Sequence, residues 1–133
     1  GEFLAYRNAI PRNNAIQVVG ETRKLLASID RVSLIISDKL KSPLRCVFGD
    51  NVLSITTKTG IGDAADQCPI EGDGGGLEIG FNNRYLMDAL KAAPAEKVRL
   101  ELTSGVAPCV ILPAEGEENF LYMVLPVRLK VSE

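Results

Sequence analysis

Residue types that carry out chemistry are either absent from this sequence or lack the spacing that the chemistry needs. Histidine does not occur among the 133 residues. Its absence excludes serine–histidine triads, cysteine–histidine pairs and histidine metal sites. Serine is common, but no serine lies in the context of a nucleophile elbow. A glycine-rich run, a group of glutamates and two aspartates remain as features that could do chemistry.

The glycine-rich run at residues 72–76 could in principle cradle a phosphate group. A phosphate-binding loop, however, ends in a lysine and a hydroxyl residue that open a helix. Here the run is followed by Leu77-Glu78-Ile79, which has the pattern of a strand. We therefore interpret residues 71–76 as a flexible connection between two strands.

The carboxylates are the other possible ligands. Glu115, Glu117 and Glu118 could hold a metal ion by residue type, but they lack the ligand spacing of a calcium loop. We interpret them as the solvated tip of a hairpin. Asp63 and Asp66 lie near the start of a predicted strand, without a histidine or another base that could act with them in catalysis. We therefore interpret them as surface carboxylates. The residues thus predict no catalytic site, no bound metal and no cofactor.

The overall composition is that of one folded domain. Apolar residues make up 46% of the chain and charged residues 24%, which is typical of a globular protein. The net charge of −2 does not indicate a strongly basic nucleic-acid module. Cys46, Cys68 and Cys109 form no CxxC pair, so we expect three buried thiols in a reducing cytosol. No apolar run approaches the length of a membrane span, and we expect a cytoplasmic protein without a membrane partner.

Two helices are expected from the hydrophobic periodicity. The first covers residues 21–37 and presents one apolar stripe. The second covers residues 82–93, with Asn82 as its N-cap and Tyr85 on its apolar face. The stripe of the first helix consists of Leu25, Ile29, Val32 and Ile36.

Strands are expected to fill most of the remaining chain, in the order β-α-β-β-β-β-α-β-β-β. Consecutive strands favour antiparallel pairing and an α+β fold. A polar and glycine turn at residues 49–51 is expected to close a hairpin. The eight predicted strands are 15–19, 44–48, 52–56, 64–70, 77–81, 97–102, 106–112 and 121–127.

Three segments of the chain, in the right order, resemble one protein family. They are Leu77–Leu90 (LEIGFNNRYLMDAL), Tyr122–Leu129 (YMVLPVRL) and Phe3–Pro11 (FLAYRNAIP). Each resembles a segment of the bacterial DNA polymerase III β subunit, the sliding clamp. The first is similar to a strand that leads into a helix, the second to the C-terminal strand, and the third to the start of the third domain.

The resemblance implies a sliding-clamp fold, with two helices packed on antiparallel sheets. Clamp protomers of the family have three similar domains, and two protomers join head to tail into a ring around duplex DNA. The ring tethers the replicative polymerase and is not itself an enzyme. This chain resembles the third domain. We expect residues 1–13 to lead in from a missing preceding domain and residues 14–133 to form one clamp domain.

The resemblance also implies an apolar pocket that binds short peptides of polymerases, clamp-loader subunits and repair proteins. Asn82 and Tyr85 are expected at its rim. Aliphatic and methionine side chains suit leucine and aromatic anchors of such peptides. The pocket residues implied by position are Asn8, Ala9, Val106, Pro108, Met123, Leu125, Pro126, Val127 and Arg128.

Two further surfaces follow from the resemblance. Lys24, Arg31, Arg84 and Lys91, with Arg23 as a weaker candidate, would face the hole and contact DNA phosphates without reading bases. The region around Leu34, Ile35 and Leu40, with the strand that follows, would meet the first domain of a second clamp protomer.

An ordinary structural role stays open as the alternative for each of these residues. Apolar strand residues are usually ordinary core, and charges on helices are usually solvated. The chain could therefore be an unrelated α+β protein-interaction domain without a role on DNA. An enzyme is the weakest of the three interpretations, because histidine and the catalytic motifs are missing.

Overall fold

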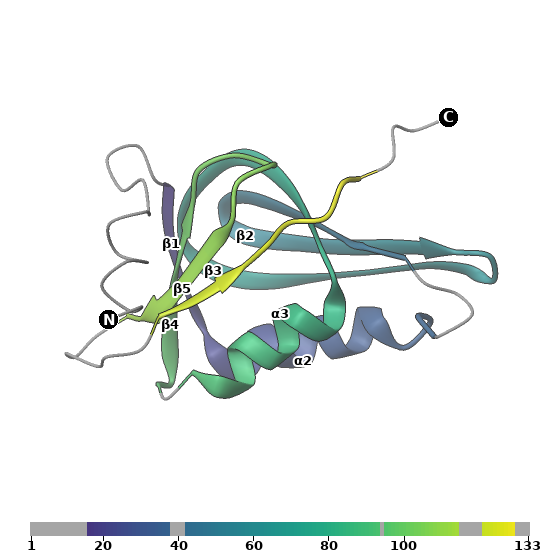
Figure 1. Cartoon of the computed structure of the whole chain (residues 1–133), viewed down its shortest axis with the longest axis horizontal. Coiled ribbons are helices and arrows are strands. Elements are labelled where there is room, and N and C mark those ends of the chain that lie inside the picture. Colours follow the sequence, from purple (N-terminus) through teal and green to yellow (C-terminus); the bar gives the residue numbers. More distant parts are fainter. Residues whose placement is uncertain (1–15, 38–41, 94, 115–120, 130–133) are drawn as a thin grey trace.

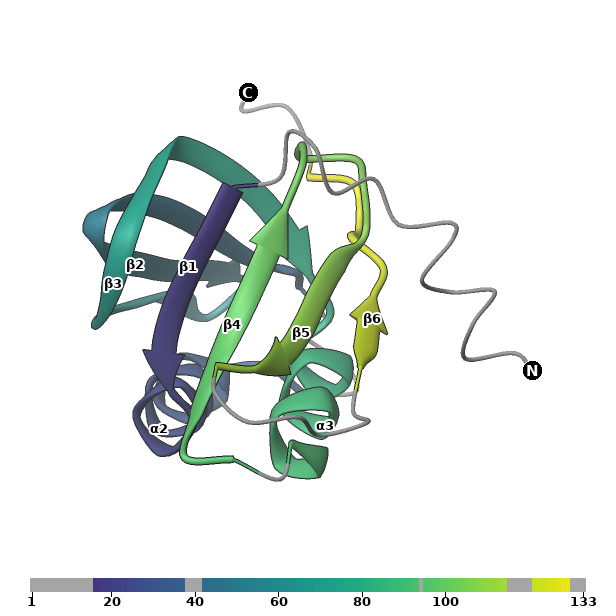
Figure 2. The same ribbon diagram turned by 90° about the vertical axis from the view of Figure 1, so that its left-hand side faces the viewer.

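The computed structural model describes residues 16–37, 42–93, 95–114 and 121–129. Within them a curled antiparallel sheet of six strands, in the order β2-β3-β1-β4-β5-β6, lies against two helices. The helices α2 and α3 lie side by side along one side of the domain (Figures 1 and 2). This is the predicted α+β class with two helices packed on antiparallel strands.

Helix α2 (Thr22–Ser33) buries three of the four residues of the predicted apolar stripe. The fourth, Ile36, lies beyond the end of the helix and is partly buried. Leu25, Ile29 and Val32 are each about 1% exposed. The helix ends four residues earlier than expected. The hydroxyl of Ser33 donates a hydrogen bond to the carbonyl oxygen of Ile29 at 2.6 Å, and such side-chain bonds compete with continued helix.

Helix α3 (Asn83–Ala92) begins where the sequence predicts. The side-chain oxygen of Asn82 accepts a hydrogen bond from the backbone N–H of Tyr85 at 3.1 Å, which confirms Asn82 as the N-cap. Leu86, Ala89 and Leu90 are buried. The placement of Tyr85 on the apolar face is wrong, because its side chain is 63% exposed.

The structure has two strands between the helices, where the sequence predicts four. Strand β2 (Leu44–Thr59) and strand β3 (Gly62–Phe81) form one long hairpin, and its turn lies at residues 60–61. Residues 49–51 are an irregularity inside β2 instead of a hairpin turn, because Leu44 pairs with Phe81 and Val52 pairs with Pro69. The order with four consecutive strands is therefore corrected to β-α-β-β-α-β-β-β.

Glycine and asparagine make this irregularity possible. Asn51 has a φ of 61°, and its side-chain oxygen accepts a hydrogen bond from the N–H of Gly72 at 3.0 Å. A Cβ at Gly74 would lie 2.3 Å from the Cβ of Phe48, so only glycine fits there. The glycine-rich run is thus part of strand β3 and packs against β2, which corrects its interpretation as a flexible connection.

The remaining strands complete the sheet around β1 (Ile16–Glu21), which pairs with β3 and with β4 (Lys97–Leu102). Strand β5 (Cys109–Pro113) pairs with β4, and β6 (Tyr122–Val124) pairs with β5. The last two strands are shorter than predicted. After β6, the backbone N–H of Val127 donates a hydrogen bond to the carbonyl oxygen of Gly80 at 2.8 Å. This bond holds the C-terminal tail against β3.

All three cysteines are free and buried, as the sequence predicts. Burial raises the pKa of the Cys46 thiol to about 12 and also raises the pKa of the Cys109 thiol. These thiols therefore behave as small apolar side chains of the core. Among the residues that the structure describes, no helix is long and apolar enough to span a membrane.

Candidate functional site

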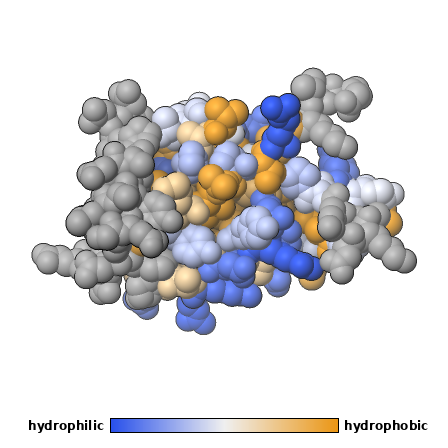
Figure 3. All heavy atoms as spheres, viewed as in Figure 1, coloured by the Kyte–Doolittle hydropathy of each residue, from blue (hydrophilic) through white to orange (hydrophobic). Residues whose placement is uncertain are grey.

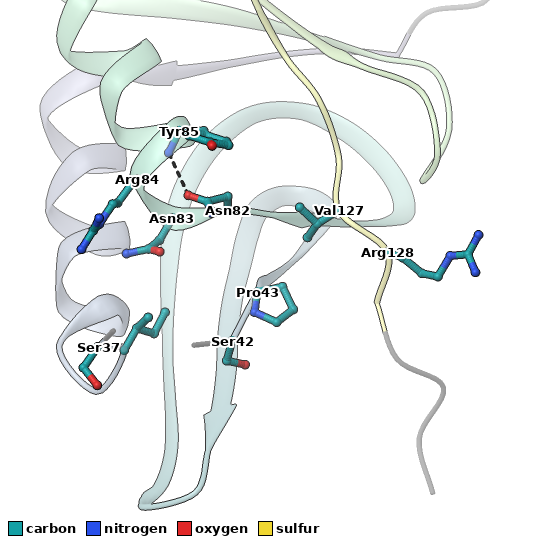
Figure 4. Close-up of a pocket in the computed structure, with 10 residues that line it drawn as sticks. Ser37, Ser42, Pro43, Asn82, Asn83, Arg84, Tyr85, Val127 and Arg128 are labelled. Carbon is teal, nitrogen blue, oxygen red and sulfur yellow. Dashed lines mark hydrogen bonds between the residues drawn. The ribbon is translucent and has the colours of Figure 1, made fainter. Parts of the chain in front are cut away.

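A cavity of about 490 Å³ lies between the α2–β2 connection, the start of α3 and the C-terminal tail. Three segments that are far apart in the sequence form its walls: the connection from α2 to β2, the N-terminal turn of α3, and the tail after β6 (Figure 4). The lining residues are Ile36, Ser37, Ser42, Pro43, Asn82, Asn83, Arg84, Tyr85, Val127 and Arg128.

Local structure holds two of these walls in place. The N-cap bond of Asn82 fixes the first turn of α3, which carries Tyr85 into the lining of the cavity (Figure 4). The bond from Val127 to Gly80 fixes the tail. A Cβ at Gly80 would lie 2.6 Å from Leu129 and 2.7 Å from the carbonyl oxygen of Val127. Glycine at this position therefore lets the tail approach β3 closely.

The loop before β5 approaches the same edge of β3. A Cβ at Gly105 would lie 2.7 Å from the carbonyl oxygen of Glu78, two residues before Gly80. Carbonyl groups of residues two apart on a strand point to the same edge of that strand. The loop that carries Val106 and the tail that carries Val127 thus meet neighbouring points of β3.

The structure brings together only part of the predicted pocket. Asn82, Tyr85, Val127 and Arg128 all line the cavity. Val106 and Leu125 are 89% and 67% exposed and lie outside its lining. The remaining members are Pro108 and Pro126, both partly buried, and Met123, which packs against the small second apolar cluster of Val110 and Leu112. Asn8 and Ala9 lie outside the described residues.

Sequence reasoning missed one wall of the cavity entirely. Ile36, Ser37, Ser42 and Pro43 come from the α2–β2 connection, about 40 positions before α3. No local motif marks them. The pairing of Leu44 with Phe81 brings this connection next to the N-cap of α3, and that pairing is not visible in local sequence.

The cavity combines apolar walls with polar groups that can fix the orientation of a ligand. Ile36, Pro43 and Val127 supply aliphatic surface, while amides, hydroxyls and two arginines surround it. Such a mixture suits a peptide that inserts apolar side chains and orders its backbone through hydrogen bonds. Among the described residues, no group of three or more cysteines or carboxylates could hold a metal ion.

The exposed side of the helices carries the predicted DNA-facing cations. Arg23, Lys24, Arg31, Arg84 and Lys91 are all exposed. Hydrophilic residues gather along the edge of the molecule where α2 and α3 lie (Figure 3). Lys24 pairs with Glu21 at 3.2 Å. Arg84 also lines the cavity, so one residue borders both surfaces.

Asp66 is more than a surface carboxylate, which corrects the sequence interpretation. Its Oδ2 atom accepts hydrogen bonds from the hydroxyl of Ser28 at 2.5 Å and from the guanidinium of Arg31 at 2.8 and 3.2 Å. These bonds, the one from Ser28 most of all, lower the pKa of the Asp66 carboxyl below its usual range. Asp66 thereby joins β3 to α2.

The structure describes two of the three residues predicted at the ring interface. Leu34 follows α2 directly and is 77% exposed, and Ile35 is partly buried. Leu40 lies outside the described residues. Ile61, at the turn of the β2–β3 hairpin, is also a large exposed aliphatic side chain, 70% exposed.

Comparison with known proteins identifies the fold. A family model described as the DNA polymerase III beta subunit, C-terminal domain, matches residues 7–128. The chain belongs to this family. A beta sliding clamp from Synechocystis is 34% identical over 97% of this chain. The DNA polymerase III beta subunit of Thermotoga maritima superposes with a TM-score of 0.84, at 28% identity over 94% of this chain.

A sliding clamp from Pseudomonas aeruginosa, solved with griselimycin bound, superposes with a TM-score of 0.83 at 29% identity over 93% of this chain. The chain spans only about a third of each relative, namely 33% of the Synechocystis protein, 34% of the Thermotoga chain and 33% of the Pseudomonas chain. Its similarity to the clamps is therefore similarity to one of their parts.

Proposed function

We propose that this chain is the third domain of a ring-shaped processivity factor of DNA replication. In that role it helps to encircle duplex DNA, tethers the replicative polymerase and binds partner peptides. It catalyses no reaction, uses no cofactor and works in the cytoplasm. Membership of the clamp family disfavours the alternative of an unrelated interaction domain.

One observation carries the peptide-binding part of the proposal. Asn82, Tyr85, Val127 and Arg128 come from segments more than 40 positions apart in the sequence, and they line one cavity (Figure 4). The resemblance assigns Val127 and Arg128 to the peptide pocket and Asn82 and Tyr85 to its rim. Chemistry also supports it, because an exposed tyrosine beside aliphatic walls is typical of interaction sites.

Val106, Leu125 and Met123 extend this pocket along the tail and the neighbouring loop. Val106 and Leu125 are largely exposed, as expected of side chains that a partner covers. A leucine or an aromatic anchor of a partner peptide would bury them. The occupants we propose are segments of polymerases, clamp-loader subunits and repair proteins.

The exposed side of α2 and α3 is the DNA-facing surface that we propose. Lys24, Arg31, Arg84 and Lys91 would contact phosphates, with Arg23 at the margin. Contacts of this kind carry no sequence information, so a clamp that uses them can slide. Leu34, Ile35 and Leu40 would meet a second protomer in the full-length ring, and an exposed Leu34 supports this assignment.

A peptide titration tests the proposal. A fluorescent peptide of the Gln-x-x-Leu-Phe type is titrated with the chain while its anisotropy is followed, and a scrambled peptide is the control. We expect saturable binding that weakens with Leu125→Ala and with Tyr85→Ala. Leu34→Ala is the matched control, because Leu34 and Leu125 are both exposed leucines and neither substitution removes buried core.

Binding that depends on Leu125 and not on Leu34 supports the assigned pocket. Equal weakening by both substitutions would contradict it. Absence of binding up to millimolar concentrations of the chain would show that this domain alone does not form the pocket.

A further inference from the structure

Arg31 is already engaged by an acidic residue of the same domain. Both its Nε and a terminal nitrogen donate to the same oxygen, Oδ2 of Asp66, at 3.2 and 2.8 Å. The side chain of Arg31 is nevertheless 59% exposed. Solvent, and anything else that approaches α2, therefore meets a guanidinium whose charge is offset by a neighbouring carboxylate.

Asp66 is held in this position by a second, buried contact. The hydroxyl of Ser28 is fully buried and donates to the same Oδ2 atom at 2.5 Å. Three hydrogen bonds thus converge on one carboxylate oxygen. The bond from Ser28 and those from Arg31 lower the pKa of the Asp66 carboxyl, so the group is ionised at neutral pH.

A second ion pair, at the N-terminus of α2, is looser. Lys24 meets Glu21 at 3.2 Å, and the two side chains are 55% and 52% exposed. No buried group is described that anchors Glu21. A lysine in such a pair can turn to another anion at little cost, since exposed pairs of this type are weak. Arg31 would have to leave a carboxylate that the protein fixes in place.

We propose that Asp66 limits the affinity of this domain for duplex DNA by holding Arg31 back from the phosphates. This inference rests on the proposed contact between α2 and DNA. A phosphate that approaches Arg31 also approaches the negative charge of Asp66, and the two repel each other. The consequence is one fewer full phosphate contact than the number of cations on the helices suggests, which favours a loose hold and sliding.

Removal of the Asp66 charge tests this inference. Asp66→Asn keeps an amide oxygen that can accept from Ser28, but it loses the charge that holds Arg31. Asp63→Asn is the matched control, because it changes the net charge equally, on the same strand. Asp63 is exposed and lies three positions from Asp66, and residues an odd number of positions apart on a strand point to opposite faces.

The measurement is the anisotropy of a fluorescent duplex titrated with each variant at several salt concentrations. We expect Asp66→Asn to bind roughly three- to tenfold more tightly at 50 mM salt, with a salt slope steeper by about 0.9, which is the value of one additional phosphate contact. Asp63→Asn should gain at most about twofold. Thermal unfolding of each variant confirms that the fold is intact.

Arg31→Gln completes a double-mutant cycle. Alone it should weaken binding less than Lys91→Gln, and in the Asp66→Asn background it should abolish the gain. If Asp66→Asn binds no more tightly than Asp63→Asn, or if its gain survives Arg31→Gln, the inference is wrong.

Failure of the proposed DNA contact gives a different result. Salt-dependent binding that Lys91→Gln weakens, without a gain from Asp66→Asn, contradicts the role of Asp66 alone. Absence of salt-dependent binding by every variant contradicts both the role of Asp66 and the proposed DNA surface.

Discussion

Gly80→Ala should detach the C-terminal tail from β3 and so damage the candidate peptide site. A Cβ at this position would lie 2.6 Å from Cδ2 of Leu129 and 2.7 Å from the carbonyl oxygen of Val127. Both distances are below ordinary van der Waals contact, so the tail has to move. Val127 and Arg128, which line the cavity, move with it.

The size of the effect follows from what the tail loses. Displacement breaks the hydrogen bond from the Val127 N–H to the Gly80 carbonyl, worth about 0.5–1.5 kcal/mol. Overpacking in a tight contact costs about 1–3 kcal/mol. Because the tail can relax into solvent, we expect the free energy of unfolding to fall by about 1–2 kcal/mol and the peptide affinity to fall more than tenfold.

Gly49→Ala is the control for this substitution. A Cβ there would lie 3.4 Å from Val52, which is an ordinary contact. The backbone of Gly49 does not adopt a positive φ, so alanine fits its conformation. Urea denaturation and peptide anisotropy are measured on both variants. If Gly80→Ala matches the unsubstituted chain in both assays, the tail does not form the wall of the site as described.

Three further predictions concern particular groups. Because hydrogen bonds lower the pKa of Asp66 in the folded state, its ionised form stabilises the fold above the unfolded-state pKa of about 3.9, and this contribution is lost as the pH falls through the folded-state pKa. Asp66→Asn should therefore flatten the acid limb of the stability–pH profile in chemical denaturation, and an unchanged limb would contradict the assigned bonds. Asn82→Ala removes the N-cap of α3 and should cost about 1 kcal/mol by urea denaturation, whereas Asn82→Asp should be close to neutral; equal costs would argue against the cap. The three buried thiols should react with a thiol reagent such as DTNB only at the rate of unfolding, so fast labelling under native conditions would show that the described core opens.

The helices could be predicted because their signals are local. Leu25, Ile29 and Val32 recur at helical spacing and are buried, and Asn82 caps α3 through the hydrogen bond that its residue type favours. A capping residue and an apolar stripe act over one or two turns. Both can therefore be recognised without knowledge of the rest of the fold.

The long hairpin could not be predicted in the same way. Residues 49–51 have the composition of a turn, but the structure uses them as an irregularity inside β2. The register depends on contacts between distant residues, such as Gly74 against Phe48. Local turn signals cannot distinguish a bulge from a reversal of the chain, so the sequence predicts two short hairpin strands where one long strand lies.

The site was predictable only through the family resemblance, and then only in part. Asn82 and Tyr85 come from the resembling segment at residues 77–90, and they line the cavity. The wall from Ile36 to Pro43 has no motif of its own. The partners of Asp66 likewise lie 35 and 38 positions away in the sequence, which no local pattern indicates.

An amide NMR titration of the isotope-labelled chain with a clamp-binding peptide tests the central claim most directly. We expect the shifts to concentrate on the cavity wall, at Asn82, Tyr85 and Val127, and the amides of β1 in the sheet to change little. A scrambled peptide should leave these amides unchanged. Shifts that cluster on another face of the domain, or none at saturating peptide, would contradict the assignment of this cavity as the peptide site.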